Sequence, residues 1–174
     1  KNMYNSLKFR SFSHFDTNHI IEIMNYHIEN GLSNFEENKI DSEIFSKIVK
    51  EIKDHNLPFI VCEKNNKIIG FAYLNKFRNK SGYRFSYENS IYIDKNYIGI
   101  GIGNQLLKKL IEENRNNINI KTIIAVIGNV NCEASISIHK KNGFNIIGTI
   151  KKVGYKKKQW LDAIYMQLIL DEKS

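Results

Sequence analysis

The chain has 174 residues, 42% hydrophobic and 25% charged, which is typical of a globular protein with a substantial buried core. One proline and two cysteines leave no Pro-rich linker, no disulfide framework and no zinc-site spacing. The net charge of +8 comes mostly from scattered lysines, so we expect a small anionic ligand and no nucleic-acid partner.

The sequence also predicts where the protein works. No apolar run reaches the length that spans a bilayer, and the first residues have no signal-peptide pattern. No internal repeat or linker divides the chain. We therefore expect a single domain over residues 1–174, located in the cytoplasm, with no membrane partner.

The first part of the chain predicts a strand followed by two helices. Residues 7–12 favour a short strand, after which Asp16 is a candidate N-cap for a helix to about Glu29, with Gly31 as its stop. Apolar residues with helical spacing after Asp41 predict the second helix.

The middle of the chain changes to strand patterns. The apolar runs 59–63 and 68–74 flank Lys-Asn-Asn-Lys, which indicates an antiparallel hairpin, and 85–93 predicts another strand. The remaining predicted elements are a helix around residues 106–111, a strand at 122–126, a helix at 133–141 and strands at 145–152 and 163–170. This order predicts an α/β fold in which helices flank a mixed central sheet.

A glycine-rich stretch, "IGIGIG" at residues 98–103, joins the strand at 85–93 to a helix. A Gly-rich turn that opens a helix can bind anions through free backbone N–H groups and the helix dipole. The Walker pattern does not fit, because Gly103 is followed by Asn104 and Gln105. The dinucleotide-binding pattern does not fit either, because Asn104 and Leu106 stand where it needs a third glycine. A flexible loop or a tight packing point is the structural alternative.

This stretch resembles the (Gln/Arg)-x-x-Gly-x-(Gly/Ala) signature of the GNAT superfamily of acyl-CoA N-acyltransferases. The resemblance implies a GNAT-like fold with a mostly antiparallel sheet, and acetyl-CoA as cosubstrate. It also implies that the loop cradles the pyrophosphate of coenzyme A, through Gly99, Ile100, Gly101, Gly103 and Asn104. Ile98 stands where the family usually has Arg or Gln, so we expect binding with less cationic help.

A second motif, "NCEASISIHKKNGF" at residues 131–144, resembles the Asn-x-x-Ser segment of the same superfamily. Asn131, Ser135 and His139 are spaced by four residues and fall on one helix face. The resemblance implies that Asn131 and Ser135 contact the cofactor, with helix capping as the alternative. Cys132 occupies the family's usual Asn position, so either it or Asn131 takes that role.

Two further stretches, "SGYRFSYENSIYI" at 81–93 and "VGYKKKQWLDAIYMQL" at 153–168, resemble the phosphinothricin and methionine-sulfone N-acetyltransferase branch. Glu88 matches a Glu of that branch, and Phe35 matches an aromatic residue that walls the substrate pocket. The resemblance further implies a homodimer, with Trp160 near a pocket shared between subunits.

Acetyl transfer to an amine needs a base, because an α-amino group with a pKa of roughly 8 arrives protonated. We expect Glu88 to take that proton. Backbone N–H groups near Tyr92 or Ile93 would stabilise the oxyanion, as the resemblance implies, and His139 would give a proton to the leaving thiolate. The alternatives are an exposed Glu88 paired with a lysine and a His139 that only caps or packs.

Arginines after the third predicted strand suggest an acidic, amino-acid-like substrate. Arg78 and Arg84, with Tyr83, would clamp its carboxylate or phosphinate, although surface positions are the alternative. Two other functions stay open: a GNAT enzyme acting on a peptide N-terminus or a polyamine, and a non-catalytic sensor of acyl-CoA.

Overall fold

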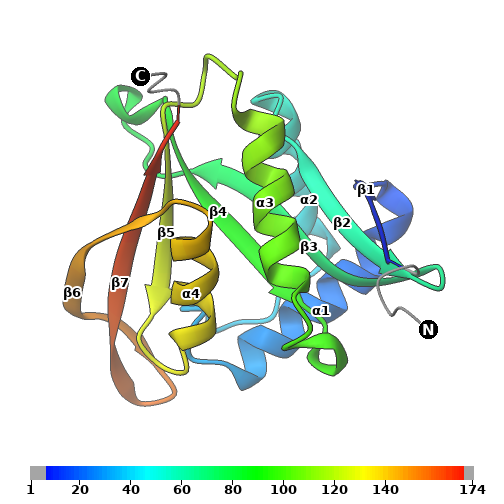
Figure 1. The fold of residues 1–174 in the computed structure, drawn as a ribbon. Coiled ribbons are helices and arrows are strands. Elements are labelled where there is room, and N and C mark those ends of the chain that lie inside the picture. The colour runs from blue at the N-terminus through cyan, green and yellow to red at the C-terminus, as the bar shows by residue number, and fades with distance from the viewer. Residues whose placement is uncertain (1–6, 171–174) are drawn as a thin grey trace.

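The computed structural model describes residues 7–170, which contain one seven-stranded sheet in the order β1-β2-β3-β4-β5-β7-β6 (Figure 1). Neighbouring strands are antiparallel except β4 and β5, which run parallel, so the predicted mixed and mostly antiparallel sheet is confirmed. Residues 1–6 and 171–174 of the predicted domain lie outside the described residues. The strands are β1 (Leu7–Ser11), β2 (Phe59–Lys64), β3 (Lys67–Lys76), β4 (Ser86–Ile93), β5 (Thr122–Gly128), β6 (Asn145–Lys156) and β7 (Gln159–Ile169).

Helices cover both faces of the sheet (Figure 1). They are α1 (Thr17–Asn30), α2 (Ser42–Asp54), α3 (Ile102–Asn114) and α4 (Glu133–Lys141). Two apolar cores result, one between the sheet and α1 and α2, the other between the sheet and α3 and α4. Because side chains alternate along a strand, Glu88 and Tyr92 of β4 face α1 and α2, whereas Tyr87 and Asn89 face α3 and α4.

The two parallel strands separate halfway along their length. Among the described residues, β4 pairs with β5 only through Ser86–Glu88 and Thr122–Ile124, although β4 continues to Ile93 and β5 to Gly128. Figure 1 shows the two strands side by side where they begin and apart where they end. The sheet therefore has a gap between the second halves of β4 and β5. The sequence pattern does not predict this gap.

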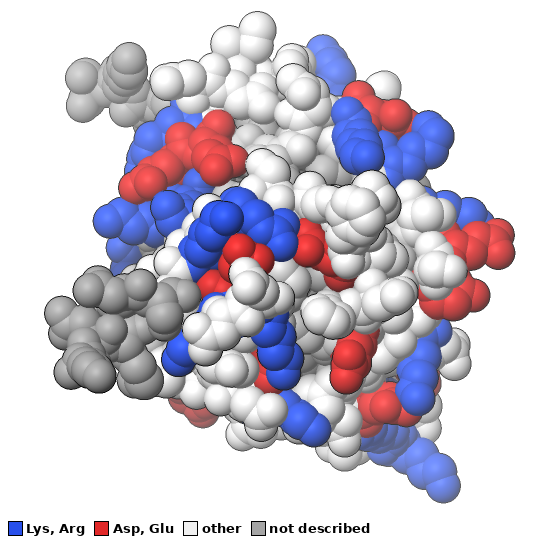
Figure 2. All heavy atoms as spheres, turned by 90° about the vertical axis from the view of Figure 1, so that its right-hand side faces the viewer, with Lys and Arg blue, Asp and Glu red and all other residues white. Residues whose placement is uncertain are grey.

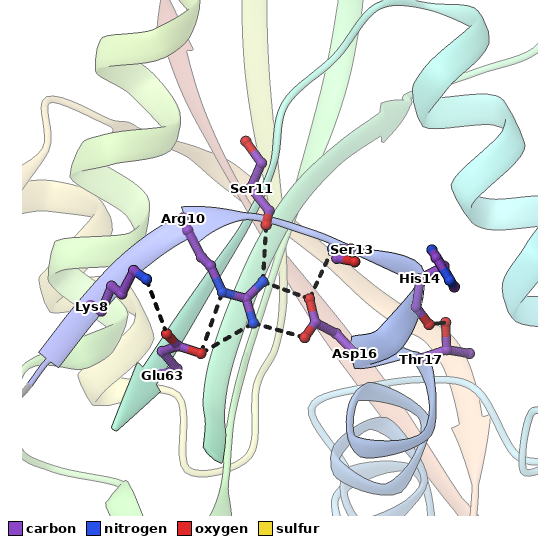
Figure 3. A network of polar contacts seen from close by, with 8 residues as sticks. All are labelled: Lys8, Arg10, Ser11, Ser13, His14, Asp16, Thr17 and Glu63. Atoms are coloured by element: carbon purple, nitrogen blue, oxygen red, sulfur yellow. Dashed lines mark hydrogen bonds and ion pairs between the residues drawn. The ribbon is translucent and has the colours of Figure 1, made fainter. Parts of the chain in front are cut away.

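The side chain of Asp16 does not cap α1, which corrects the predicted role of this residue. Its carboxylate accepts hydrogen bonds of 2.8 Å from Nη1 and Nη2 of Arg10 and from the backbone N–H of Ser13 (Figure 3). Arg10 also donates from Nη2 to Glu63 over 3.1 Å. Asp16 is 6% exposed, so this network joins β1, β2 and the start of α1 from a largely buried position.

The last two strands are longer than predicted and form a hairpin. β6 continues to Lys156, and β7 begins at Gln159 instead of residue 163. The turn between them consists of Lys157 and Lys158, with φ angles of 50° and 60°. Type I′ turns need a positive φ at both central residues, and Asn and Gly usually supply it, so two lysines gave no turn signal.

Charges of both signs mix on the side of the molecule that is at the right in Figure 1 and faces the viewer in Figure 2. The exposed surface of α2 has the same character, with ion pairs from Lys47 to Glu43 and from Lys50 to Asp54. None of the helices within residues 7–170 combines the length and apolarity needed to cross a bilayer.

Candidate active site

A cavity of about 550 Å³ lies where β4 and β5 separate. It is surrounded by the end of α1 and the α1–α2 loop, the second halves of β4 and β5, the glycine stretch, the first turn of α3 and one side of α4. The predicted site residues that line it are Phe35, Glu88, Tyr92, Ile93, Gly99, Gly101, Gly103, Asn104, Asn131, Ser135 and His139. Cys132 lines it as well, so both alternatives for the family Asn position reach the cavity.

Four predicted residues do not belong to the lining of this cavity: Ile100, Arg78, Tyr83 and Arg84. Ile100 packs against the core on the α3 and α4 side. The guanidinium groups of Arg78 and Arg84 lie over neighbouring aromatic rings, 4.3 Å and 4.5 Å from the ring centroids. Because the Ile100 side chain packs against the core, this residue can contribute only backbone groups to the glycine stretch.

The glycine stretch has the backbone geometry of an anion site. Gly99 and Gly101 have φ angles of 85° and 90°, in the left-handed region that favours glycine, and Gly101 is the N-cap of α3. A Cβ on either glycine would have no heavy atom within 4 Å, so the space beside them is open. The first N–H groups of a helix lack intrahelical acceptors, and this end of α3 therefore fits a pyrophosphate.

Asn104 contributes differently from its neighbours in the loop. Its side-chain oxygen accepts a hydrogen bond of 2.8 Å from Nδ2 of Asn142, at the end of α4. This bond ties the first turn of α3 to the end of α4 and fixes the orientation of the Asn104 side chain.

Glu88 lies at the point where the strands separate, on the α1 and α2 side. Partial burial raises the pKa of its carboxyl group, and the positive charge of Arg78 offsets part of that rise. A carboxylate with a raised pKa is a stronger proton acceptor. Glu88 is thus suited to act as a general base at one mouth of the cavity.

His139 lies on the other side of the sheet and is 3% exposed. Its Nδ1 is 2.6 Å from the carbonyl oxygen of Ser135, and its Nε2 is 2.9 Å from Nδ2 of Asn89. Burial lowers the pKa of the imidazole. Because both ring nitrogens are engaged in hydrogen bonds, His139 could act as the predicted proton donor only after one of these bonds breaks.

The α1–α2 loop closes the cavity beside Glu88. Nδ2 of Asn34 donates to the hydroxyl of Tyr92 over 2.8 Å, and Nζ of Lys156 donates to the backbone oxygen of Asn34 over 2.7 Å. Lys156 is 2% exposed, and its burial lowers the pKa of the ammonium group. β4 and β6 thus both hold this loop in place.

Several residues around the cavity have no signal in the sequence motifs. His27 of α1 places Nε2 2.5 Å from the backbone oxygen of Ile93, at the end of β4. Lys156 reaches the loop from β6, more than a hundred residues away along the chain. Only Asn89 had a usable signal, since alternation along 86–93 places it on the face opposite Glu88.

Two curated relatives share about a third of their residues with this chain. Phosphinothricin N-acetyltransferase of Alcaligenes faecalis is 34% identical over 148 residues, 85% of this chain and 75% of the relative. An L-methionine sulfoximine/L-methionine sulfone acetyltransferase of Salmonella typhimurium is 36% identical over 115 residues, 66% of each chain. Both support the branch that the sequence motifs predict.

Two solved structures have the same fold over nearly the whole chain. A phosphinothricin acetyltransferase of Sinorhizobium meliloti, in complex with acetyl-CoA, has a TM-score of 0.89 and 32% identity, covering 96% of this chain and 90% of that one. A ribosomal-protein-alanine N-acetyltransferase of Brucella melitensis has a TM-score of 0.89 and 36% identity, covering 94% and 99%.

The family model described as an acetyltransferase (GNAT) domain matches residues 9–165, which include the whole lining of the cavity. The same residues hold the glycine stretch at the start of α3 and the parallel pair β4 and β5. The chain therefore belongs to the GNAT family of acetyltransferases.

Proposed function

We propose that the protein transfers an acetyl group from acetyl-CoA to the α-amino group of a small amino-acid-like substrate of the phosphinothricin or methionine-sulfone type. One observation carries the proposal: a single cavity joins the anion site at α3 to the partly buried Glu88 on the opposite side of the sheet. Donor and acceptor can therefore meet where β4 and β5 separate.

Acetyl-CoA would enter from the α3 and α4 side. The backbone around Gly99, Gly101 and Gly103 and the first turn of α3 would hold its pyrophosphate, while Asn131 and Ser135 line the path of the pantetheine arm. Backbone N–H groups near Tyr92 and Ile93 would stabilise the oxyanion. These groups would hold the cofactor and orient its thioester, and none of them would move a proton.

The amine would enter from the α1 and α2 side, beside Glu88. Glu88 removes the ammonium proton, directly or through a water, so that the neutral amine can attack the thioester carbonyl. The Phe35 ring and Asn34 bound the acceptor side of the cavity. The anion clamp of Arg78, Tyr83 and Arg84 stays a prediction. It is supported for Arg78, whose positive charge is close enough to offset part of the rise in the pKa of Glu88.

Thiol release from acetyl-CoA tests the proposal. The purified chain is given phosphinothricin, methionine sulfone, methionine sulfoximine, common amino acids, polyamines and alanine-initiated peptides. Turnover confined to the first three supports the proposed substrate class. Turnover on peptides alone would favour the second candidate, which rests on the similarity to the Brucella melitensis protein.

Equilibrium binding of acetyl-CoA completes the test. Binding without turnover on any amine in the panel would contradict the proposal and favour an acyl-CoA sensor. The homodimer and the cytoplasmic location remain predictions beside this function. Exposed Trp160 and Tyr155 on the β6–β7 hairpin give apolar surface that a second copy would cover.

A further inference from the structure

The hydrogen bonds of His139 fix where its ring keeps a hydrogen atom. Nδ1 lies 2.6 Å from the carbonyl oxygen of Ser135, which can only accept, so Nδ1 carries the hydrogen. Nε2 lies 2.9 Å from the side-chain amide nitrogen of Asn89, which can only donate, so Nε2 offers its lone pair.

The opposite orientation of the Asn89 amide would suit only a charged ring. Rotating the amide by 180° would place its oxygen against Nε2, and two acceptors would then meet unless Nε2 gained a second ring proton. The imidazole is 3% exposed and lies perpendicular to the ring of Phe144, with the ring centroids 4.9 Å apart, so its burial disfavours that charge.

Charged neighbours do not compensate. Lys140 and Lys141 follow His139 on α4 and are exposed, while Glu88, next to Asn89 on β4, faces the other side of the sheet. β5 has no charged residue, and α3 contacts α4 through Asn104. The polar surroundings of the ring among the described residues are therefore Asn89 and Ser135.

The orientation of Asn89 leaves one polar atom unsatisfied. Its side-chain oxygen is buried and has no hydrogen-bond partner in residues 7–170. Folded proteins rarely keep such an orphan acceptor, and those that remain often belong to functional arrangements. Asn89 thus keeps the hydrogen bond from its amide nitrogen to Nε2 of His139, although its buried oxygen stays unsatisfied.

We infer that Asn89 is a positioning residue that holds His139 in the neutral Nδ1–H tautomer, so that neither ring nitrogen has a free hydrogen to give to a group in the cavity. The inference deepens the proposed function and rests on it only for its effect on turnover. Coenzyme A thiolate would then leave without a proton from His139, which is feasible because a thiol pKa is near about 8.5.

Nitrogen NMR of the full chain labelled at histidine tests the inference directly. The chain has five histidines, and the signals lost in His139→Gln identify this ring. We expect hydrogen on Nδ1 alone at pH 7, persisting as the pH falls below the usual histidine value of about 6.5. A hydrogen on Nε2 at pH 7, in either a neutral or a charged ring, would overturn the inference.

Asn89→Asp reverses the polarity of the partner. A carboxylate only accepts, so we expect His139 to become doubly protonated at pH 7 and its titration to shift upward. Asn75→Asp is the matched control: Asn75 lies on the neighbouring strand and the opposite sheet face, and its side-chain oxygen is likewise buried and unpartnered. Its His139 signals should match the parent's.

The NMR result is separate from the activity result. If Asn89→Asp does not fold, the tautomer of the parent protein still decides the inference. Turnover with an Nε2–H tautomer would contradict the inference and leave the proposed function intact. An Nδ1–H tautomer without turnover on any amine would support the inference and contradict the proposed function.

Discussion

The ring of Phe35 fills the space in front of Gly154, where a Cβ would lie 2.7 Å from two ring carbons. Gly128 on β5 is similar, since a Cβ there would lie 2.8 Å from Cα of Ser33 and 3.1 Å from Cε1 of Phe35. Real Cβ atoms do not approach neighbours this closely. Two glycines on two strands therefore create the notch that seats the acceptor-side loop.

Gly154→Ala should displace this loop. The added methyl group forces the Phe35 ring away, which we expect to raise the KM for the amine and to lower the free energy of unfolding by about 1–3 kcal/mol. Steady-state kinetics and denaturant unfolding measure the two effects. Gly148→Ala on the same strand is the control, because its Cβ would have no heavy atom within 4 Å. Equal effects in both variants would contradict the notch.

Glu88→Gln should remove the base and preserve the fold. We expect kcat to fall by about 10²- to 10⁴-fold with unchanged acetyl-CoA affinity, because the anion site is separate from Glu88. Glu113→Gln, an exposed change of the same kind on α3, serves as control. A Glu88→Gln enzyme as fast as the parent would exclude Glu88 as the base.

The pH profile of the parent enzyme tests the same assignment. Burial raises the pKa of Glu88, and a base acts only when deprotonated, so kcat/KM should fall as the pH decreases through that raised pKa. The acidic limb should lie above the usual glutamate value of about 4.3. It should disappear in Glu88→Gln, and its persistence there would assign it to another group.

Ile98→Arg should strengthen cofactor binding. Ile98 is 60% exposed and lines the cavity beside the glycine stretch, at the position where the resemblance of the sequence motif implies Arg or Gln. An exposed ion pair contributes about 0.2–1 kcal/mol, so we expect a Kd for acetyl-CoA that is lower by a factor of about 1.4 to 5, with the gain lost at high salt. Calorimetric titration measures it. Ile118→Arg, at a 92% exposed position, should leave the Kd unchanged.

Asp16→Asn should destabilise the protein in a pH-dependent way. Burial acts to raise the pKa of Asp16, but the hydrogen bonds from Arg10 and Ser13 outweigh it, so the pKa is lowered. The stabilisation is therefore complete above the unfolded value of about 3.9 and disappears as the pH falls through the lower folded value. We expect a loss of about 1–3 kcal/mol at pH 7.

Denaturant unfolding at neutral and acidic pH checks this expectation. The difference between parent and Asp16→Asn should shrink as Asp16 becomes protonated in the parent. Asp54→Asn provides the comparison, because Asp54 is exposed and, within residues 7–170, its ion pair is with Lys50 on the same helix. If Asp54→Asn lowered the free energy of unfolding as much as Asp16→Asn does, the burial of Asp16 would not explain its stabilising effect.

Local patterns predicted the fold better than the contacts between distant elements. The hairpin around Asn65 and Asn66 was readable because both residues favour the left-handed turn, with φ angles of 50° and 62°. Lys157 and Lys158 adopt the same conformation without that preference. Asp16 matched the N-cap pattern, but Arg10, from a strand that lies beside it only in the folded chain, binds its carboxylate instead.

The same distinction between local patterns and long-range contacts applies to the candidate site. Gly99 and Gly101 were predictable because their backbone chemistry is local, and Glu88 because its motif is short. The separation of β4 from β5 is set by the register of the sheet, and no residue of either strand predicts that register. Contacts such as His27 to Ile93 and Lys156 to Asn34 depend on that separation, and for this reason they were not predictable.

The separation of β4 from β5 also gives the sheet two additional edges. An open sheet ordinarily has unpaired backbone groups only along its outermost strands, here β1 and β6. The second halves of β4 and β5 expose such groups in the middle of the molecule, where an amide-containing ligand can lie between them as an extra strand does. Occupancy of the cavity would then complete the sheet, so amide hydrogen exchange along both strand ends should slow when a ligand binds.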